Sequence, residues 1–231
     1  MIIAIDGPAG AGKSTVAKRL AEKLDFLYID TGAMYRALTL KALDTKIDIR
    51  DTKRLIDMAR RSEIQLINEP DGSLKVLLDS SDVSKEIREP RITKHVSDLA
   101  KVKGVREIML KLQRKLGRQN NSVLEGRDIG TVVFPKADLK FFLDADFKER
   151  VKRRYKDLKN LEIKRQTVKN VAADLKNRDT IDSTRKVAPL KKAKDAVYMD
   201  TTCLSINEVV EALIKETDRK IKLKHSKAKL A

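Results

Sequence analysis

The sequence Gly7-Pro8-Ala9-Gly10-Ala11-Gly12-Lys13-Ser14 decides the fold of this chain, because it fits the pattern G-x-x-x-x-G-K-[ST] of a phosphate-binding loop. Before it, the apolar run Ile2-Ile3-Ala4-Ile5-Asp6 is typical of a buried strand. After it, Val16, Leu20 and Leu24 recur every four residues, as on one face of a helix. The order strand, loop, helix predicts that the loop holds the phosphate groups of a nucleotide.

The chemistry of such a loop assigns a role to each part of it. Glycine lets the backbone wrap closely around a phosphate, and successive N–H groups then face the anion. The following helix directs its positive end at the same point. We expect residues 7–15, which end at Thr15, to bind ATP, with Lys13 at the outer phosphates and the Ser14 hydroxyl holding Mg²⁺. A glycine-rich turn without a ligand is the alternative, which the flanking strand and helix disfavour.

Length and composition predict a globular, heavily charged protein. The 231 residues suffice for one elaborated domain, and 41% of them are apolar and 37% charged. No stretch of 18 apolar residues occurs, so we expect no membrane span. The N-terminus lacks the layout of a signal peptide, and Cys203 is the only cysteine, so no intrachain disulfide is expected. These features predict a cytoplasmic protein.

The formal net charge of +17 is large. It is typical of a nucleic-acid partner, of a pocket that holds several phosphates at once, or of a solvated basic surface. Composition alone leaves these interpretations open, so the placement of the charged residues along the chain has to separate them.

A second polar cluster follows the next predicted strand, 26–30. Asp30 or Thr31 can cap a following helix, on which Thr31 and Tyr35 share one face with Arg36 beside them. Polar side chains at the carboxyl end of a strand lie where open α/β sheets bind ligands. The competing interpretation is that Tyr35 only packs at the edge of the core.

The segment from about 40 to 100 interrupts the alternation of strands and helices. The runs 63–67 and 74–78 flank a turn rich in Pro, Asp and Gly, which predicts an antiparallel hairpin. Short helices are expected on both sides of it. We interpret the whole segment as an insertion in the main sheet that is able to move as a unit.

A third cluster follows the predicted strand 122–126, where Gly126 and Gly130 bracket Arg127 and Asp128. Glycines at a strand end indicate the close approach of a ligand. The Arg127 guanidinium can bridge phosphate oxygens as a fork, and Asp128 can accept from an amino group of a base or hold Mg²⁺ through water. An ion pair between the two residues at the surface is the alternative.

Basic residues outnumber acidic ones between about 148 and 166, after the predicted strand 138–144. Arg150, Arg153 and Arg154 lie close together on an expected helix. We interpret this segment as a lid whose arginines stabilise a transferring phosphoryl group. A charge run is more often a solvated surface, which is the competing interpretation.

A fourth cluster precedes the last predicted strand, 196–200. Arg178, Asp182 and Arg185 are spaced to lie on one helical face, where they can bind a sugar diol and a base edge or form an internal ladder of ion pairs. After the strand, Ser205-Ile206-Asn207-Glu208 is a capping box that begins a helix. The basic residues that follow are expected to form a frayed, solvated tail.

All these clusters are expected at one edge of a parallel sheet. No Cys or His nucleophile is needed, so the sum predicts a kinase for a small acceptor that itself carries phosphate. The many arginines outside the loop favour such an anionic acceptor.

The sequence resembles the bacterial cytidylate kinases, which are nucleoside monophosphate kinases. The similarity covers nearly all of residues 1–215, in the strings IDGPAGAGKST, DTGAMYR, VREIML, EGRDIGTVVFP, KFFLDA and RDTIDSTRKVAPL. It implies an α/β P-loop kinase fold, with a five-stranded parallel sheet flanked by helices, an inserted monophosphate-binding domain that carries the hairpin, and a short lid. The division is a single domain 1–217 (core 1–39 and 101–217, insertion about 40–100, lid about 148–166) and a basic tail 218–231.

The resemblance also implies an activity and its residues. The activity is transfer of the γ-phosphoryl group of ATP to CMP or dCMP with Mg²⁺, by a chain that we expect to be a monomer because the fold closes without a partner. The implied catalytic residues are Lys13, Arg127, Asp128, Arg150, Arg153 and Arg154. The residues implied near the cytosine are Thr31, Arg106, Asp128 and Arg185, with Tyr35 packed on the base. Arg36 and Arg127 would hold the acceptor phosphate. The pentose would be held by Ser97, Arg178 and Asp182.

The chain departs from the family pattern at two places. Some members have Ser in place of Thr31, and either hydroxyl makes the same bond. Some members have a second Arg where this chain has Thr180-Ile181, which puts any role of that extra charge in doubt.

Other functions stay open at this point. The acceptor can be UMP or AMP instead, and the resemblance does not rank CMP against dCMP. A nucleic-acid-binding ATPase would use the +17 charge, but only 4% of the residues are aromatic and no aromatic–basic platform for stacking bases is present, so a nucleic-acid partner is not expected. An assembly protein that keeps the loop as a nucleotide sensor is disfavoured by the intact Lys13 and Ser14.

Overall fold

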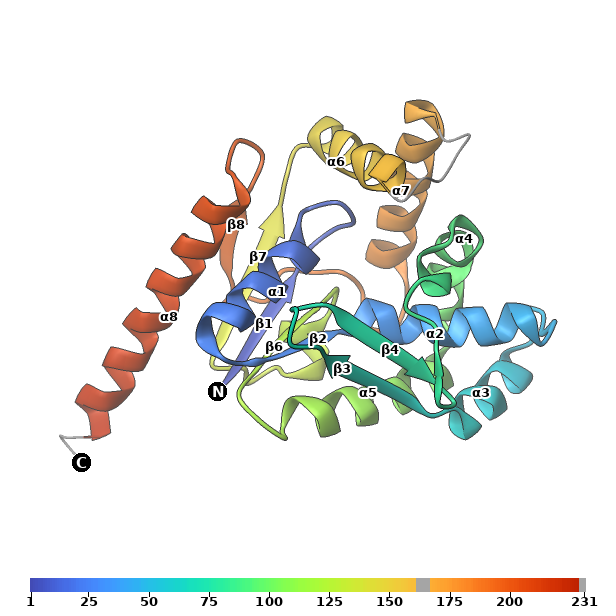
Figure 1. The fold of residues 1–231 in the computed structure, drawn as a ribbon, viewed down its shortest axis with the longest axis horizontal. Coiled ribbons are helices and arrows are strands. Elements are labelled where there is room, and N and C mark those ends of the chain that lie inside the picture. The colour runs from blue at the N-terminus through green and yellow to red at the C-terminus, as the bar shows by residue number, and fades with distance from the viewer. Residues whose placement is uncertain (161–166, 229–231) are drawn as a thin grey trace.

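A parallel sheet of five strands forms the centre of the computed structural model, which describes residues 1–160 and 167–228, with side chains up to Lys222 (Figure 1). Neighbouring strands are parallel throughout, and Ile3 of the central strand lies opposite both Val123 and Leu139. The predicted five-stranded parallel sheet is therefore confirmed. The strands in spatial order are β2 (Leu27–Asp30), β6 (Ser122–Gly126), β1 (Ile2–Asp6), β7 (Leu139–Asp144) and β8 (Val197–Asp200).

Alternate residues of β1 point to opposite faces of the sheet, and each face has its own core. Ile3 and Ile5 pack with α1 (Lys13–Leu24) and α8 (Ile206–Ala228). Ala4 packs on the other face with α5 (Lys103–Gly117) and the π-helical turn η2 (Ile129–Val133). Because β1 is buried on both sides and central, the phosphate-binding loop that follows it is anchored at the middle of the carboxyl edge of the sheet.

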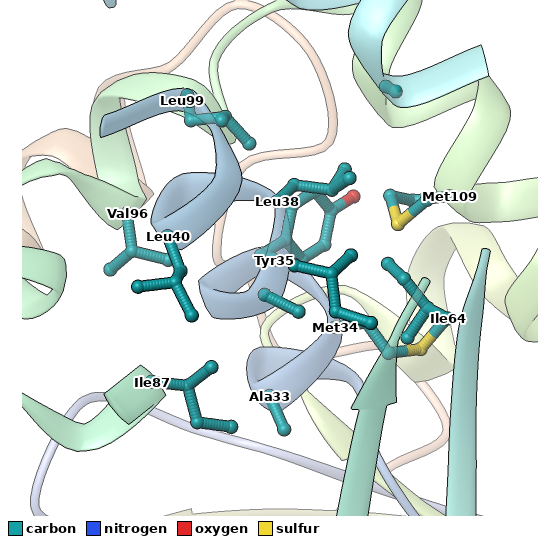
Figure 2. Packing of buried hydrophobic residues seen from close by; sticks show 14 of the residues in the cluster. Ala33, Met34, Tyr35, Leu38, Leu40, Ile64, Ile87, Val96, Leu99 and Met109 are labelled. Carbon is teal, nitrogen blue, oxygen red and sulfur yellow. The ribbon is translucent and has the colours of Figure 1, made fainter. Parts of the chain in front are cut away.

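The insertion has a hydrophobic core of its own, built around α2 (Thr31–Asp44). Figure 2 shows Met34 and Leu38 of this helix between Val96 and Leu99 on one side and Met109 on the other. The helix that carries Thr31, Tyr35 and Arg36 is thus continuous across the predicted boundary at residue 40, and its position is fixed by the packing of the insertion.

The predicted hairpin is present, with β3 (Ile64–Asn68) antiparallel to β4 (Leu74–Leu78). A third short strand, β5 (Ser81–Asp82), extends this sheet and was not predicted. The hairpin also contacts the main sheet, because the Asn68 side chain donates to the Tyr28 carbonyl at 3.1 Å. The remaining elements of the insertion are α3 (Thr52–Arg61), η1 (Glu86–Arg88) and α4 (Pro90–Leu99).

Two helices, α6 (Phe147–Asn160) and α7 (Val168–Thr184), lie beside the phosphate-binding loop (Figure 1). The predicted lid, about 148–166, covers α6 and residues 161–166, which lie outside the described residues. α7 follows this segment, and we refer to α6 and α7 together as the lid helices. α7 runs as far as Thr184, so Arg178 and Asp182 are helical and Arg185 caps the carboxyl end of the helix.

The capping box of α8 is confirmed, since the Ser205 amide donates to Glu208 Oε2 at 2.8 Å and the Glu208 amide donates to Ser205 Oγ at 3.3 Å. The expected fraying is wrong for residues 218–228, where α8 continues as far as Ala228. The inner face of α8 extends into this segment, because Thr217 is buried and Ile221, one turn further on, is half-buried. Among the described residues, no helix is both long enough and apolar enough to cross a membrane.

Candidate active site

A cavity of about 920 Å³ lies at the carboxyl edge of the main sheet. It is lined by the phosphate-binding loop, by the start of α2, by the turn after β6 and by side chains from α4, α5, α6 and α7. All four polar clusters therefore meet in one space, as the positions of the strand ends predicted.

The loop residues from Ala9 to Thr15 line this cavity, whereas Gly7 and Pro8 do not. Gly12 has a φ of +83°, a left-handed conformation that favours glycine at the start of α1. A Cβ on Gly7 would lie 1.9 Å from the Leu143 carbonyl oxygen, so this glycine lets the loop pass close to β7. The first two loop residues thus shape the loop, and the others face the cavity.

Lys13 is 5% exposed, and its ammonium donates to the Pro8 carbonyl at 2.7 Å. Burial, followed by repulsion from Arg127, lowers the pKa of Lys13 to about 7, although the Glu125 and Asp6 carboxylates oppose the shift. A buried cation with a single neutral hydrogen-bond acceptor is stabilised strongly when an anion enters beside it.

Glu125 is a site residue that the sequence analysis did not single out. It is the carboxylate at the end of β6, it is 4% exposed, and it accepts hydrogen bonds from the Tyr28 hydroxyl at 2.6 Å and from Ser14. Burial and the nearby Asp30 raise its pKa. Its position is the signal in the sequence. Glu125 is the acidic residue near the carboxyl end of β6, and β6 pairs with β1, the strand that the phosphate-binding loop follows.

Asp6 is a second residue that was missed, and it links the loop to the turn after β6. Its two carboxylate oxygens accept from the Ile129 amide at 2.8 Å and from the Gly130 amide at 2.7 Å. Burial raises the pKa of Asp6 to about 6 even though these two hydrogen bonds lower it. Asp6 thereby fixes the backbone that presents Asp128.

The start of α2 presents Thr31, Tyr35 and Arg36 to the cavity. Asp30 is the helix cap, since its side chain accepts from the Ala33 amide at 2.8 Å. The Thr31 hydroxyl donates to the Glu125 carbonyl at 2.6 Å. Tyr35 lines the cavity, and the Arg106 guanidinium lies over the Tyr35 ring at 5.5 Å from the ring centre. Tyr35 also packs in the hydrophobic core of the insertion, so it belongs to both the core and the site.

An ion-pair network connects α5, the turn after β6 and α7. Asp128 contacts Arg106 at 2.5 Å and Arg185 at 3.3 Å, and Asp182 contacts Arg127 at 2.9 Å. Although burial opposes it, Arg127 and Arg185 hold the pKa of Asp182 below its usual value. Of the ladder considered from the sequence, only the pair of Asp182 with Arg185 is present, at 3.7 Å, and no ion pair joins Arg178 to it among the described residues. All three residues line the cavity.

The centre of the cavity carries positive charge that no carboxylate among the described residues fully neutralises. The Nε atoms of Arg36 and Arg178 are buried there without a hydrogen-bond partner in the described part of the chain. Burial and the neighbouring guanidinium groups lower the pKa of both, that of Arg178 to about 9, and burial together with Arg36 lowers that of Arg154. Arg88 of η1 also lines this space, and no sequence motif pointed to it. The arrangement suits a ligand with several negative charges.

The three predicted lid arginines lie in different surroundings. Arg154 lines the cavity near Arg36. Arg153 lines it too, but its guanidinium donates to Glu149 at 3.0 Å and to the Thr201 carbonyl at 2.6 Å. Arg150 is not among the lining residues and lies behind the loop. Ser97 of α4 lines the cavity as predicted.

Comparison with known proteins gives a consistent result over almost the whole chain. The family model described as "Cytidylate kinase" matches residues 3–219. The chain is 53% identical over 211 residues to the cytidylate kinase of Caldanaerobacter subterraneus subsp. tengcongensis, which covers 90% of this chain and 91% of the relative. It is 46% identical over 220 residues to the cytidylate kinase of Bacillus subtilis strain 168, covering 94% and 96%.

A solved structure shows the same fold at much lower identity. An uncharacterized protein from Eubacterium ventriosum matches with a TM-score of 0.51 and 15% identity, and the match covers 95% of this chain and 98% of that one. At this identity, the similarity concerns the fold alone.

Proposed function

The chain belongs to the cytidylate kinase family, whose members are phosphotransferases, and we propose that it transfers the γ-phosphoryl group of ATP to CMP and dCMP. The observation that carries the proposal is one cavity lined both by the phosphate-binding loop and by Arg36 and Arg178, whose Nε atoms are buried without a hydrogen-bond partner among the described residues. A donor and an acceptor that both carry phosphate match these two cationic regions.

ATP is the donor, and its phosphate groups bind to the loop residues 10–15, while Gly7, Pro8 and Ala9 shape the loop. Lys13 leaves the Pro8 carbonyl and contacts the outer phosphates. Arg153 and Arg154 approach the transferring group from α6. The presence of all these residues in the lining of one cavity supports these roles.

The acceptor lies against α2, α5 and α7. Arg36 and Arg127 hold its phosphate, with Arg88 as a further cation that the structure adds to the predicted set. Ser97, Arg178 and Asp182 contact the pentose. The base is bounded by Thr31, Arg106, Asp128 and Arg185, with Tyr35 packed against it.

Mg²⁺ fits the donor side of the cavity. Ser14 offers a hydroxyl oxygen that faces the cavity, and the buried Glu125 carboxylate is hydrogen-bonded to it, so the available donors are the oxygen ligands that Mg²⁺ prefers. Among the described residues no group of three or more His, Cys, Asp or Glu side chains could hold a metal on its own, which suits an ion that arrives with ATP. When bound, the ion neutralises charge on the phosphate oxygens.

The residues act by positioning and by charge neutralisation rather than by covalent chemistry. The acceptor phosphate oxygen attacks the γ-phosphorus in line with the leaving oxygen of ADP. Arg36 and Arg127 align the attacking phosphate and reduce its repulsion from ATP. Lys13 and Arg154 stabilise the charge on the transferring group, and a closed cavity keeps water from competing as acceptor.

The proposal is tested by a coupled kinase assay with ATP, Mg²⁺ and a panel of monophosphates. We expect kcat/KM for CMP and dCMP to exceed that for UMP and AMP by at least about 100-fold. The reason is that polar side chains placed to hydrogen-bond cytosine lose their partners when another base binds. Equal use of UMP or AMP would overturn the assigned base. ATP hydrolysis that nucleic acid stimulates, without CMP phosphorylation, would overturn the activity.

Substitution of Arg185 tests the base site. Arg185→Met removes one of the two cations that hold Asp128, and we expect KM for CMP to rise about 10- to 100-fold while KM for ATP changes less than twofold. Steady-state kinetics with each substrate varied in turn measure both constants. Lys186→Met is the matched control, because it removes a neighbouring exposed charge. Equal losses for the two substrates would contradict the assignment.

The pKa of Lys13 predicts that ATP binding takes up a proton. With a pKa of about 7, the amine is mostly neutral at pH 8 in the free protein, and an anion beside it restores its usual high pKa. We expect an uptake close to one proton at pH 8, and less at pH 6, where the amine is already charged. Titration calorimetry in buffers of different ionisation enthalpy measures this uptake.

The control for proton uptake is Lys13→Arg, which keeps a charged side chain across the whole range. The uptake at pH 8 should disappear in this variant even though its affinity for ATP falls. An unchanged uptake would assign the proton to another group, with Glu125 and Asp6 as the titratable neighbours.

A further inference from the structure

The tip of the phosphate-binding loop is held by both lid helices through one residue, Ala9. The Ala9 carbonyl accepts from Arg150 Nη1 at 3.0 Å, and the Ala9 amide donates to Asp179 Oδ1 at 3.2 Å. Arg150 and Asp179 are themselves paired at 2.5 Å. An ion pair between α6 and α7 thus binds both polar backbone groups of a single loop residue.

Apolar packing reinforces this contact. The Ala9 side chain is 4% exposed and packs with Val151 and Leu158 of α6 and with Val171 and Leu175 of α7. The tip of the loop is therefore part of the small core that joins the two lid helices.

The backbone of α6 also approaches the loop directly. A Cβ on Gly10 would lie 2.9 Å from the Arg150 carbonyl oxygen, and Gly10 has a φ of +78°. Both the conformation and the close approach require glycine, so the loop and α6 are fitted to each other at this point.

The Arg150 guanidinium is held at this place through its Nε and Nη1 atoms. Its Nε donates to the Ala145 carbonyl at 3.1 Å, it lies over the Phe147 ring at 5.3 Å, and the residue is 8% exposed. It does not line the cavity, in contrast to Arg153 and Arg154. A side chain with these partners is not placed to contact the transferring phosphoryl group.

We propose that Arg150 and Asp179 are positioning residues that set the conformation of the phosphate-binding loop by clasping Ala9 between α6 and α7. The inference rests on the proposed function, because it assigns this pair to the ATP side of the cavity. The contact fixes Ala9 at the tip of the loop. The backbone amides of residues 10–14, which come next in the chain and face the phosphates in the proposed complex, are held in place as a result. The phosphate site then forms when α6 and α7 pack on the loop, and not in a separate step.

The test compares Arg150→Met, Asp179→Asn and the double variant. In Asp179→Asn, the amide oxygen can still accept from the Ala9 amide, but its NH₂ group faces the Arg150 donor, so the pair is broken with almost no change of volume. We expect each single change to raise KM and Kd for ATP about tenfold, with KM for CMP within twofold. The double variant should be no worse than either single one, because the two residues act as a unit.

Lys152→Met is the matched control, since it removes a charge from the same helix at an exposed position, and it should leave all constants unchanged. A fall in kcat of more than about 100-fold at unchanged KM for ATP would show that Arg150 contacts the transferring group, and would overturn the proposal. A lower melting temperature with unchanged affinity for ATP would overturn it too, as would additive losses in the double variant. The calorimetric Kd for ATP is measured without an acceptor. A wild-type protein that binds ATP but fails to phosphorylate CMP would therefore refute the proposed function, while the Kd values of the variants would still test the contact of Arg150 and Asp179 with Ala9.

Discussion

Lys13→Ala is expected to lower kcat about 1000-fold while KM for CMP changes less than threefold. The Lys13 ammonium is buried within the phosphate-binding loop, where it donates to the Pro8 carbonyl, so its loss acts on the donor phosphates. Removal of one preorganised donor from a developing charge costs about 100- to 1000-fold, and phosphoryl transfer depends almost entirely on such neutralisation. Steady-state kinetics with ATP saturating and CMP varied measure both constants.

Loss of fold cannot account for this result. Burial disfavours the charged form of Lys13 and lowers its pKa, so removal of the charge offsets the packing that is lost, and we expect a melting temperature close to that of the wild type. Lys18→Ala on the exposed side of the same helix is the control and should behave like the wild type. Unchanged turnover in Lys13→Ala would refute the role of the loop in catalysis.

The elements that carry the fold are predictable because their signals are local. The buried run Ile2–Asp6, the glycine pattern of the loop and the four-residue repeat of α1 each lie within a few neighbouring residues. The hairpin has an equally local signal in its turn. The convergence of Thr31 and Arg127 on one cavity is also predictable, because each follows a strand of a parallel sheet, whereas Arg178 reaches the cavity from α7.

The partners of each charged side chain are not predictable in this way. Arg150, Arg153 and Arg154 have the same chemistry in sequence, and only the packing of α6 on the loop separates Arg150 from the other two. Arg88 reaches the cavity because η1 is folded against α2, which no spacing reveals. The length of α8 is not evident from the sequence, because the basic composition of its last turns conceals an inner face that continues past Thr217 to the half-buried Ile221.

Arg178→Met is expected to lower kcat/KM for CMP about 100-fold and at the same time to stabilise the ligand-free protein. Arg178 lies beside Arg36 and Arg127 with a buried Nε that has no hydrogen-bond partner among the described residues, and these surroundings lower its pKa to about 9. A methionine keeps most of the apolar packing and removes a repelled, partly desolvated cation. We expect a gain of about 1–2 kcal/mol, which is a rise of roughly 2–8 °C in melting temperature for a chain of this size.

The ligand dependence of the melting temperature distinguishes a binding residue from a structural one. CMP at millimolar concentration should raise the melting temperature of the wild type by mass action and leave that of Arg178→Met nearly unchanged, so that the order of stabilities reverses when the ligand is added. Arg60→Met, which removes an exposed arginine paired with Asp57 on α3, should alter neither the melting temperature nor the kinetics. If Arg178→Met instead melts lower than the wild type without ligand, the Asp182 contact outweighs the repulsion and Arg178 supports the fold rather than the acceptor.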